Sequence, residues 1–246
     1  MEIEYAKVSA IGDRQDNQDR AEVLFGDDSQ LAIVVDGMGG HAHGDLAAET
    51  AVASLANRFC QLGRHPIPAD AFLETSISEA HEEVLNLGAG MRPEMRPGAI
   101  VVCALVSGNQ LRWAHVGDSR AYHLRDGHIL ANTQDQSMVG TLLAAGKISA
   151  EQALTHPERH MVEYCLGVDE HTPPIPTIEP RELQAGDIVL LCTDGLWSQL
   201  GEASIVERLN NSKDLQITLQ ALAEDAVRAG YPQSDNVTAV ALRALD

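Results

Sequence analysis

The stretch Leu31-Ala32-Ile33-Val34-Val35-Asp36-Gly37-Met38-Gly39-Gly40 guides the interpretation of the whole chain. Its first five residues are apolar and mostly β-branched, which indicates a buried strand. The strand leads to Asp36, and the glycines that follow give the backbone conformations that are closed to other residues. A carboxylate at the end of a stiff strand, beside accessible carbonyl oxygens, suits a hard divalent cation. Asp-Gly is also a common turn dipeptide, so the stretch taken alone favours a plain turn over a metal site.

The composition narrows the class of protein. The chain has 246 residues, of which 44% are hydrophobic and 22% charged, as in an ordinary globular protein. No composition shift or linker divides it, so we expect a single domain over residues 1–246. The 36 acidic and 17 basic residues give a formal charge of −19. Such a field repels a phosphate backbone, and we therefore expect no nucleic-acid partner.

Cysteine usage and hydropathy predict where the protein works. The four cysteines lie far apart without CxxC spacing, which indicates neither a disulfide framework nor a zinc ribbon. No charged-then-apolar leader opens the sequence, and no apolar run approaches the length of a membrane span. We therefore expect a cytoplasmic monomer that has no membrane partner.

The periodicity of the sequence predicts short strands and amphipathic helices. Apolar runs joined by two- or three-residue turns indicate antiparallel sheets. We expect one helix capped by Asp45 and ended by Gly63, and a second from near Asp70 to Gly88. The expected strands cover about residues 2–10, 21–25, 31–35, 99–106, 111–116, 121–125, 188–192 and 237–242. The further expected helices cover about 137–146 and 150–154, with Ser149 capping the latter, and the surroundings of Ile205 and of 215–226.

Five aspartates share a position relative to these strands. An apolar strand ends at each of Asp36, Asp118 and Asp194, whereas Asp235 and Asp19 each come just before a strand. Strand ends on one edge of a sheet converge, so these carboxylates are expected to meet in a cleft. Clustered carboxylates repel one another and have raised pKa values unless cations hold them together. Their oxygen-only chemistry indicates Mg²⁺ or Mn²⁺, and not Zn²⁺.

Such a site suits phosphoryl chemistry. Two metal ions close together stabilise an in-line displacement at phosphorus, and a guanidinium can pair with the non-bridging oxygens. Arg14, in the polar segment before Asp19, is the first candidate for this guanidinium, and Arg120 is the second. Either arginine could form a structural ion pair instead, and for Arg120 that is the simpler interpretation.

Seven short motifs, in order, now carry a family resemblance. The chain resembles the metal-dependent serine/threonine protein phosphatases of the protein phosphatase 2C type, bacterial branch, from about residue 8 to 242. Each motif is weak alone, whereas seven in order are specific. The motifs are Arg14-x-x-Asn17-Gln18-Asp19, Asp36-Gly37-Met38-Gly39-Gly40-His41, Gly117-Asp118-Ser119-Arg120, Asp135-Gln136-Ser137, His156-Pro157-x-Arg159, Thr193-Asp194-Gly195-Leu196 and Ser234-Asp235-Asn236.

The resemblance implies a fold and a metal site. The fold would be α+β, a four-layer α/β/β/α sandwich with two central antiparallel sheets flanked by helices, and with a flap over residues 138–160. Two catalytic Mn²⁺ or Mg²⁺ ions would bind at one end of the sandwich, with a possible third. Their ligands would be Asp36 as the bridge, the Gly37 carbonyl, Asp194 and Asp235 for the first ion, Asp19 for the second, and Asp118 for the third. Arg14 would hold the substrate phosphate.

The sequence departs from the family pattern at three places. Met38 stands where eukaryotic relatives have a histidine proposed as general acid, so water or another group must protonate the leaving oxygen. His41 is close to it in sequence, although a solvated loop histidine is the simpler interpretation. Gly98-Ala99-Ile100 replaces the usual Gly-Thr-Thr, and Glu163-Tyr164-Cys165 replaces the usual Thr-Arg-Ala, which removes a basic residue after the flap.

The resemblance implies a protein serine/threonine phosphatase that uses a metal-bridged hydroxide and forms no phosphoenzyme. Its expected partners are phosphorylated proteins and a eukaryotic-like bacterial kinase that it opposes. Two other functions remain open from the sequence. One is a non-catalytic phosphoprotein-binding module, which would require loss of a ligand. The other is a metal phosphodiesterase or small-molecule phosphatase, which the same two-metal chemistry would serve.

Overall fold

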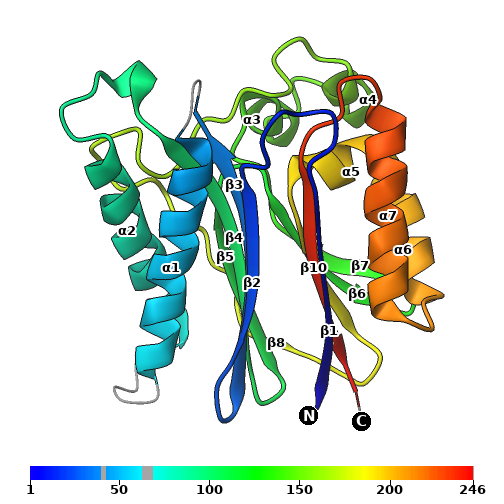
Figure 1. The fold of residues 1–246 in the computed structure, drawn as a ribbon. Coiled ribbons are helices and arrows are strands. Elements are labelled where there is room, and N and C mark those ends of the chain that lie inside the picture. Colours follow the sequence, from blue (N-terminus) through cyan, green and yellow to red (C-terminus); the bar gives the residue numbers. More distant parts are fainter. Residues whose placement is uncertain (40–42, 63–68, 246) are drawn as a thin grey trace.

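The protein is a sandwich of two five-stranded antiparallel sheets with helices on both outer faces (Figure 1). The computed structural model describes residues 1–39, 43–62 and 69–245. This arrangement confirms the predicted α+β sandwich. Both chain termini lie at one end of the sandwich, and the short helices α3 and α4 lie at the other.

The two sheets have the following strands. The first sheet has the order β2-β3-β4-β5-β8, formed by Asp19–Phe25, Ser29–Met38, Gly98–Ser107, Gln110–Val116 and Arg181–Glu182. The second has the order β1-β10-β9-β6-β7, formed by Ile3–Ala10, Val237–Ala244, Ile188–Cys192, Arg120–Arg125 and His128–Asn132. The link from β5 to β6 passes from one sheet to the other, and it carries Asp118.

The helices divide between the two faces. Helices α1 (Gly44–Leu62) and α2 (Ala69–Leu87) cover the first sheet, and α5 (Asp194–Leu200), α6 (Glu202–Asn210) and α7 (Leu215–Gly230) cover the second (Figure 1). Helices α3 (Met138–Ala144) and α4 (Ala150–Leu154) are N-capped by Ser137 and Ser149. A short 3₁₀ turn covers Pro93–Met95. None of the helices described is both long and apolar enough to span a bilayer.

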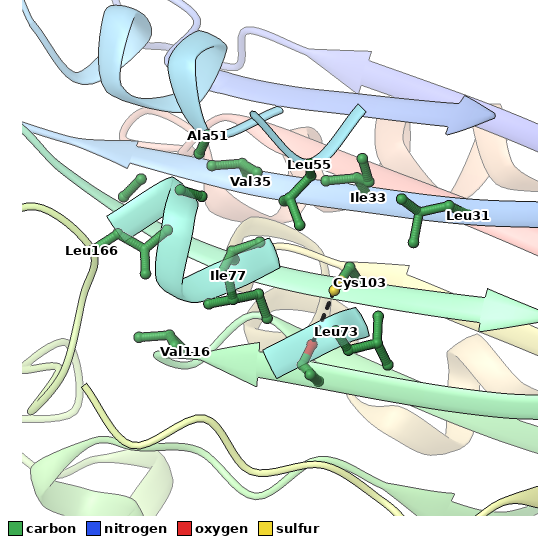
Figure 2. Close-up of a cluster of buried hydrophobic side chains, with 14 of the residues drawn as sticks. Leu31, Ile33, Val35, Ala51, Leu55, Leu73, Ile77, Cys103, Val116 and Leu166 are labelled. Carbon is green, nitrogen blue, oxygen red and sulfur yellow. Dashed lines mark hydrogen bonds between the residues drawn. The ribbon is translucent and has the colours of Figure 1, made fainter. Parts of the chain in front are cut away.

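Three apolar layers hold the sandwich together. Leu31, Ile33 and Val35 face α1 and α2, whereas Ala32 and Val34 face the second sheet. Because β3 is buried on both faces, its sequence is continuously apolar and does not alternate. Figure 2 shows the layer between the first sheet and its helices, where the Cys103 thiol donates to the Ala114 carbonyl at 3.7 Å. The third layer lies between the second sheet and helices α5 to α7.

One predicted helix boundary was wrong, and one helix was not predicted. Helix α1 begins at Gly44, so Asp45 lies in its first turn and is not its cap; its Oδ1 accepts from the Leu46 amide. Asp194 follows the end of β9 and is the first residue of α5, the helix that was not predicted; an acidic side chain there interacts favourably with the helix dipole. The expected Gly63 helix end and the residue His41 lie outside the described residues.

The strands also differ in detail from the sequence prediction. Strand β3 continues through Asp36 and Gly37 to Met38, so Asp36 is paired within the sheet and does not follow it. The sequence reasoning missed two edge strands, β7 and the two-residue β8. Strand β7 is only five residues long, and exposed and half-buried residues alternate along it, whereas β8 consists of two charged residues; neither gave the pattern of a buried strand.

Candidate metal centre

A cleft of about 890 Å³ opens at the end of the sandwich away from the chain termini. Strands β3, β5 and β9 end there, and β10 begins there. The antiparallel order therefore delivers aspartates from four separate segments to one place. The cleft is lined by Asp36, Asp118, Asp194 and Asp235, together with Arg14.

Asp19 lies behind this cleft and does not line it. It pairs directly with Asp36 across strands β2 and β3, and its side chain is almost fully buried. Its Oδ2 accepts a hydrogen bond from the Thr193 hydroxyl at 3.0 Å. Burial raises the pKa of Asp19 to about 7, although the hydrogen bonds from Thr238 and Thr193 oppose the rise. The structure thus brings Asp19 beside the other four carboxylates, in a second layer.

Asp36, Asp118 and Asp194 have raised pKa values. Burial, followed by the negative charges of Asp19 and Asp194, holds the pKa of Asp36 well above its usual range. Burial and Asp194 raise the pKa of Asp118 to about 8. The pKa of Asp194 rises to about 6, through burial and the charge of Asp235. Neighbouring carboxylates raise one another's pKa when positive charge is scarce, so the cleft favours a cation.

Arg14 supplies a positive charge directly to a carboxylate of the cleft. Its guanidinium contacts the Asp235 carboxylate at 2.6 Å, and the charge of Arg14 also lowers the pKa of Asp194. In the part of the chain that the structure describes, no three Asp, Glu, His or Cys side chains are close enough, as they stand, to hold an ion together. Carboxylates that repel one another separate until a cation draws them in. The oxygen-only donor set, the raised pKa values and the guanidinium on Asp235 therefore fit a hard divalent ion.

The loop that carries Arg14 is fixed by residues from the far end of the sequence. The Asn236 amide donates to the carbonyls of Ile11 and Asp16, and its Oδ1 accepts from the Gln18 amide. Ser234 exchanges hydrogen bonds with Asp13 in the same way. Sequence reasoning placed Asn236 in a motif and missed its role, which is to hold the loop of Arg14 against Asp235.

Gly37 is confined by the first turn of α1. A Cβ on Gly37 would lie 2.0 Å from the Gly44 carbonyl oxygen and 2.7 Å from that of Gln18. No larger residue fits, because the helix start packs directly on the end of β3. The glycine therefore allows close packing at the rim of the cleft.

Arg120 has the structural role that the sequence favoured. Its guanidinium makes two parallel hydrogen bonds to Asp135, both at 2.8 Å, and a third to Glu202 at 3.0 Å. It also stacks on the Trp197 ring, with 3.5 Å between the guanidinium carbon and the ring centroid. The Trp197 indole N–H in turn donates to the Asp118 carbonyl. Arg120 thus supports the turn of Asp118 and has no guanidinium group left for a phosphate.

Further residues of the cleft come from positions that the sequence had flagged or passed over. Met38 and Ile100 line it, and Ile100 pairs with Asp36 across β3 and β4. Arg159 and His160, in the segment after α4, also line the cleft; Arg159 brings a positive charge, whereas burial lowers the pKa of His160. The His-Pro-x-Arg motif was the available signal for Arg159, whereas nothing in the sequence indicated His160.

A sequence profile decides the family. The profile described as protein phosphatase 2C matches residues 8–229. The chain belongs to the protein phosphatase 2C family. This membership agrees with the predicted resemblance.

Relatives of this phosphatase 2C chain are bacterial. It is 35% identical to the serine/threonine protein phosphatase PstP of Mycobacterium tuberculosis over 89% of this chain, but it spans only 41% of that protein's length. It is 32% identical to the serine/threonine phosphatase stp of Listeria innocua, over 92% of this chain and 89% of that protein.

Solved structures of the family share the sandwich. The serine/threonine phosphatase Stp1 of Staphylococcus aureus superposes with a TM-score of 0.89 at 27% identity, covering 100% of this chain and 96% of that one. The catalytic domain of PstP, solved in complex with two manganese ions, superposes with a TM-score of 0.79 at 32% identity, over 99% of both chains. The two manganese ions belong to that PstP structure.

Proposed function

We propose that the chain is a Mn²⁺- or Mg²⁺-dependent protein serine/threonine phosphatase that acts in the cleft between the two sheets. The observation that carries the proposal is the group of four cleft aspartates with Arg14, of which Asp36, Asp118 and Asp194 have raised pKa values. The names of the bacterial relatives and the manganese-bound PstP structure support the same conclusion. The catalytic unit would be the whole of residues 1–246, with the flap over 138–160.

The proposed ligand roles are those that the family resemblance implies. Asp36 would bridge two ions, Asp194 and Asp235 would complete the first shell with the Gly37 carbonyl, and Asp19 would serve the second ion from behind. Asp118 would bind a third ion that it shares with Asp194. When bound, the ions would supply a nucleophile from water at neutral pH and neutralise charge on the phosphoryl group.

The chain's own residues would position the substrate. Arg14 is more than half exposed, so its guanidinium can exchange Asp235 for a phosphate oxygen. Arg159 and His160 stand in the same cleft and would contact the phosphate or its flanking peptide. Met38 has no proton to give, so the leaving oxygen would take its proton from water or from His160.

The proposed substrates are phosphoserine and phosphothreonine on proteins, including those of an opposing kinase. We also propose a cytoplasmic location, which the four free cysteines support because structural disulfides are rare in reducing compartments.

The test is hydrolysis of a phosphothreonine peptide. We expect Mn²⁺-dependent phosphate release that stops with EDTA and falls at least about a thousandfold in Asp36→Asn. Asp27→Asn, in the exposed hairpin at the opposite end, is the matched control and should keep full activity. Undiminished turnover by Asp36→Asn contradicts the proposal. Tight peptide binding without turnover would indicate a binding module, and faster turnover of nucleotides or diesters would indicate a small-molecule enzyme.

A further inference from the structure

Asp118 reaches the metal cleft on a turn whose shape is fixed by residues outside the cleft. The turn joins β5 to β6, and Gly117, just before Asp118, has a φ of 100°, in the left-handed region. A Cβ on Gly117 would lie 2.6 Å from the Ile100 side chain, so the turn packs directly on β4. Glycine can adopt many backbone conformations, so Gly117 alone does not select this one. Its neighbours must therefore fix the direction of the chain at Asp118.

Gln136 forms hydrogen bonds with both backbone polar groups of Gly117. Its backbone amide donates to the Gly117 carbonyl at 3.0 Å, and its side-chain Oε1 accepts from the Gly117 amide at 2.8 Å. The Trp197 indole, from α5, donates to the next carbonyl along the chain, that of Asp118, at 3.1 Å. These hydrogen bonds hold three successive peptide groups of the turn, and Gln136 supplies two of them.

The other polar groups of Gln136 anchor it to two segments beyond the flap. Its Nε2 donates to the Pro174 carbonyl at 2.9 Å, and its backbone carbonyl accepts from the Glu163 amide at 2.8 Å. A carbonyl only accepts and an amide N–H only donates, so the partners on either side fix the orientation of the side-chain amide. Gln136 is therefore held in place on one side and holds Gly117 on the other.

Asp118 needs such support because its surroundings are unfavourable for a charged group. Asp118 is 5% exposed, and burial, followed by the negative charge of Asp194, raises its pKa. The lost hydration and the repulsion both favour a conformation in which the carboxylate turns away from Asp194 and into water. A turn whose peptide groups are held by hydrogen bonds opposes that movement.

We propose that Gln136 is a positioning residue for Asp118: by bonding both polar groups of Gly117, it holds the Asp118 carboxylate beside Asp194, where the two share a metal ion. The inference rests on the proposed function, in which Asp118 and Asp194 are ligands of that ion. Gln136 does not line the cleft, so it acts on the ion only through the turn. Loss of a residue that orients a metal ligand typically weakens metal binding about ten- to a hundredfold.

The experiment titrates the full chain with Mn²⁺ and measures the free ion by electron paramagnetic resonance. We expect tight binding together with a weaker site that Asp118→Asn removes. Gln136→Met keeps the length of the side chain and loses the acceptor for Gly117, so it should weaken this weaker site at least about tenfold and leave the tight binding within about twofold. Gln136→Glu keeps an acceptor for the Gly117 amide, and it should keep the weaker site within about threefold of the unmodified chain.

Thr133→Val is the matched control, because the Thr133 hydroxyl accepts from the Ala121 amide of β6 at 3.1 Å and has no part in the turn. Both Thr133→Val and Gln136→Met should lower Tm in EDTA, whereas only Gln136→Met should weaken the weaker Mn²⁺ site. The proposal is overturned if Gln136→Met leaves that site unchanged, if Thr133→Val or Gln136→Glu weakens it equally, or if the unmodified chain lacks it. The tight Mn²⁺ binding and the hydrolysis of a phosphopeptide test the proposed function separately.

Discussion

Two buried carboxylates, Asp187 and Asp118, have pKa values that are shifted in opposite directions. Asp187 is 1% exposed and accepts from Arg125 at 2.6 and 2.7 Å, from His123 at 2.8 Å and from the Gln184 amide at 2.9 Å. Burial alone would raise its pKa, but these donors outweigh burial and the pKa lies below its usual range. Asp118 is 5% exposed, and burial together with Asp194 raises its pKa to about 8.

The difference separates structural from functional carboxylates. A buried carboxylate whose positive partners come from its own chain is complete, and it stabilises the fold. One that is surrounded by other carboxylates destabilises the folded state unless a cation arrives from solution. The cleft of this phosphatase 2C chain is of the second kind, and the network of Asp187 is of the first.

The largest expected effect is on the hydrogen-bonded network around Asp187. Asp187→Asn leaves Arg125 and His123 without their charge partner, and we expect it to lower the free energy of unfolding by about 3 kcal/mol. In metal-free protein, Asp36→Asn should have the opposite sign, because it removes a repelled charge. Thermal unfolding of both variants in EDTA measures this. If both variants lose stability, the proposed difference between the two kinds of buried carboxylate is contradicted.

Manganese should act on the cleft alone. At a hundred times its dissociation constant it should stabilise the fold by about 2.7 kcal/mol, a rise of roughly 5–10 °C in Tm. The rise should persist in Asp187→Asn and disappear in Asp36→Asn. Equal rises in the two variants would place the ion elsewhere.

The pH dependence of stability should also follow the cleft. The folded-state pKa values of Asp19 and Asp118, about 7 and about 8, lie above the unfolded value. The folded state therefore binds more protons, so its stability is lost as pH rises through these values. We expect metal-free protein to lose about 1–2 kcal/mol between pH 6.5 and 8.5. Denaturant titration at several pH values measures this. Asp118→Asn should make the free energy of unfolding less dependent on pH; an unchanged dependence would show that Asp118 is not its cause.

The smallest expected effect concerns the two arginines. Arg14 is half exposed and has one ion pair, whereas Arg120 is committed to Asp135 and Glu202. Arg14→Ala should raise KM for a phosphopeptide about tenfold with little change in Tm. Arg120→Lys should lower Tm, because lysine cannot reproduce the bidentate pair. A large Tm loss in Arg14→Ala would make it a structural residue like Arg120.

The sequence revealed strand positions more reliably than contacts between distant segments. The run from Leu31 to Val35 predicted β3 because a strand buried on both faces is continuously apolar. The sequence analysis gave Asp194 as the end of an apolar strand and did not predict the helix α5 that begins there, although Leu196, Trp197 and Leu200 carry a helical spacing. Asp-Gly occurs both in turns and at helix starts, and only the residues after it decide.

The site was predictable as a set of carboxylates and not as an arrangement. Strand ends identified the four aspartates of the cleft, because antiparallel order brings alternate ends together. The second-layer place of Asp19, the Arg14–Asp235 pair and the anchoring by Asn236 were not predictable. The last two depend on the pairing of β1 with β10, which joins residues more than 200 positions apart. The place of Asp19 depends on the pairing of β2 with β3 and on Thr193, 174 residues away. Their roles as metal ligands stay predictions.

Because Asn236 anchors the Arg14 loop, the site can form only late in the synthesis of the chain. Arg14 and Asp235 are 221 residues apart, and Ser234 and Asn236 form hydrogen bonds that hold the loop between β1 and β2. During synthesis the chain emerges from its N-terminus, and contacts across such a separation form last. The cleft therefore cannot be assembled before Asp235 and β10 have been synthesised.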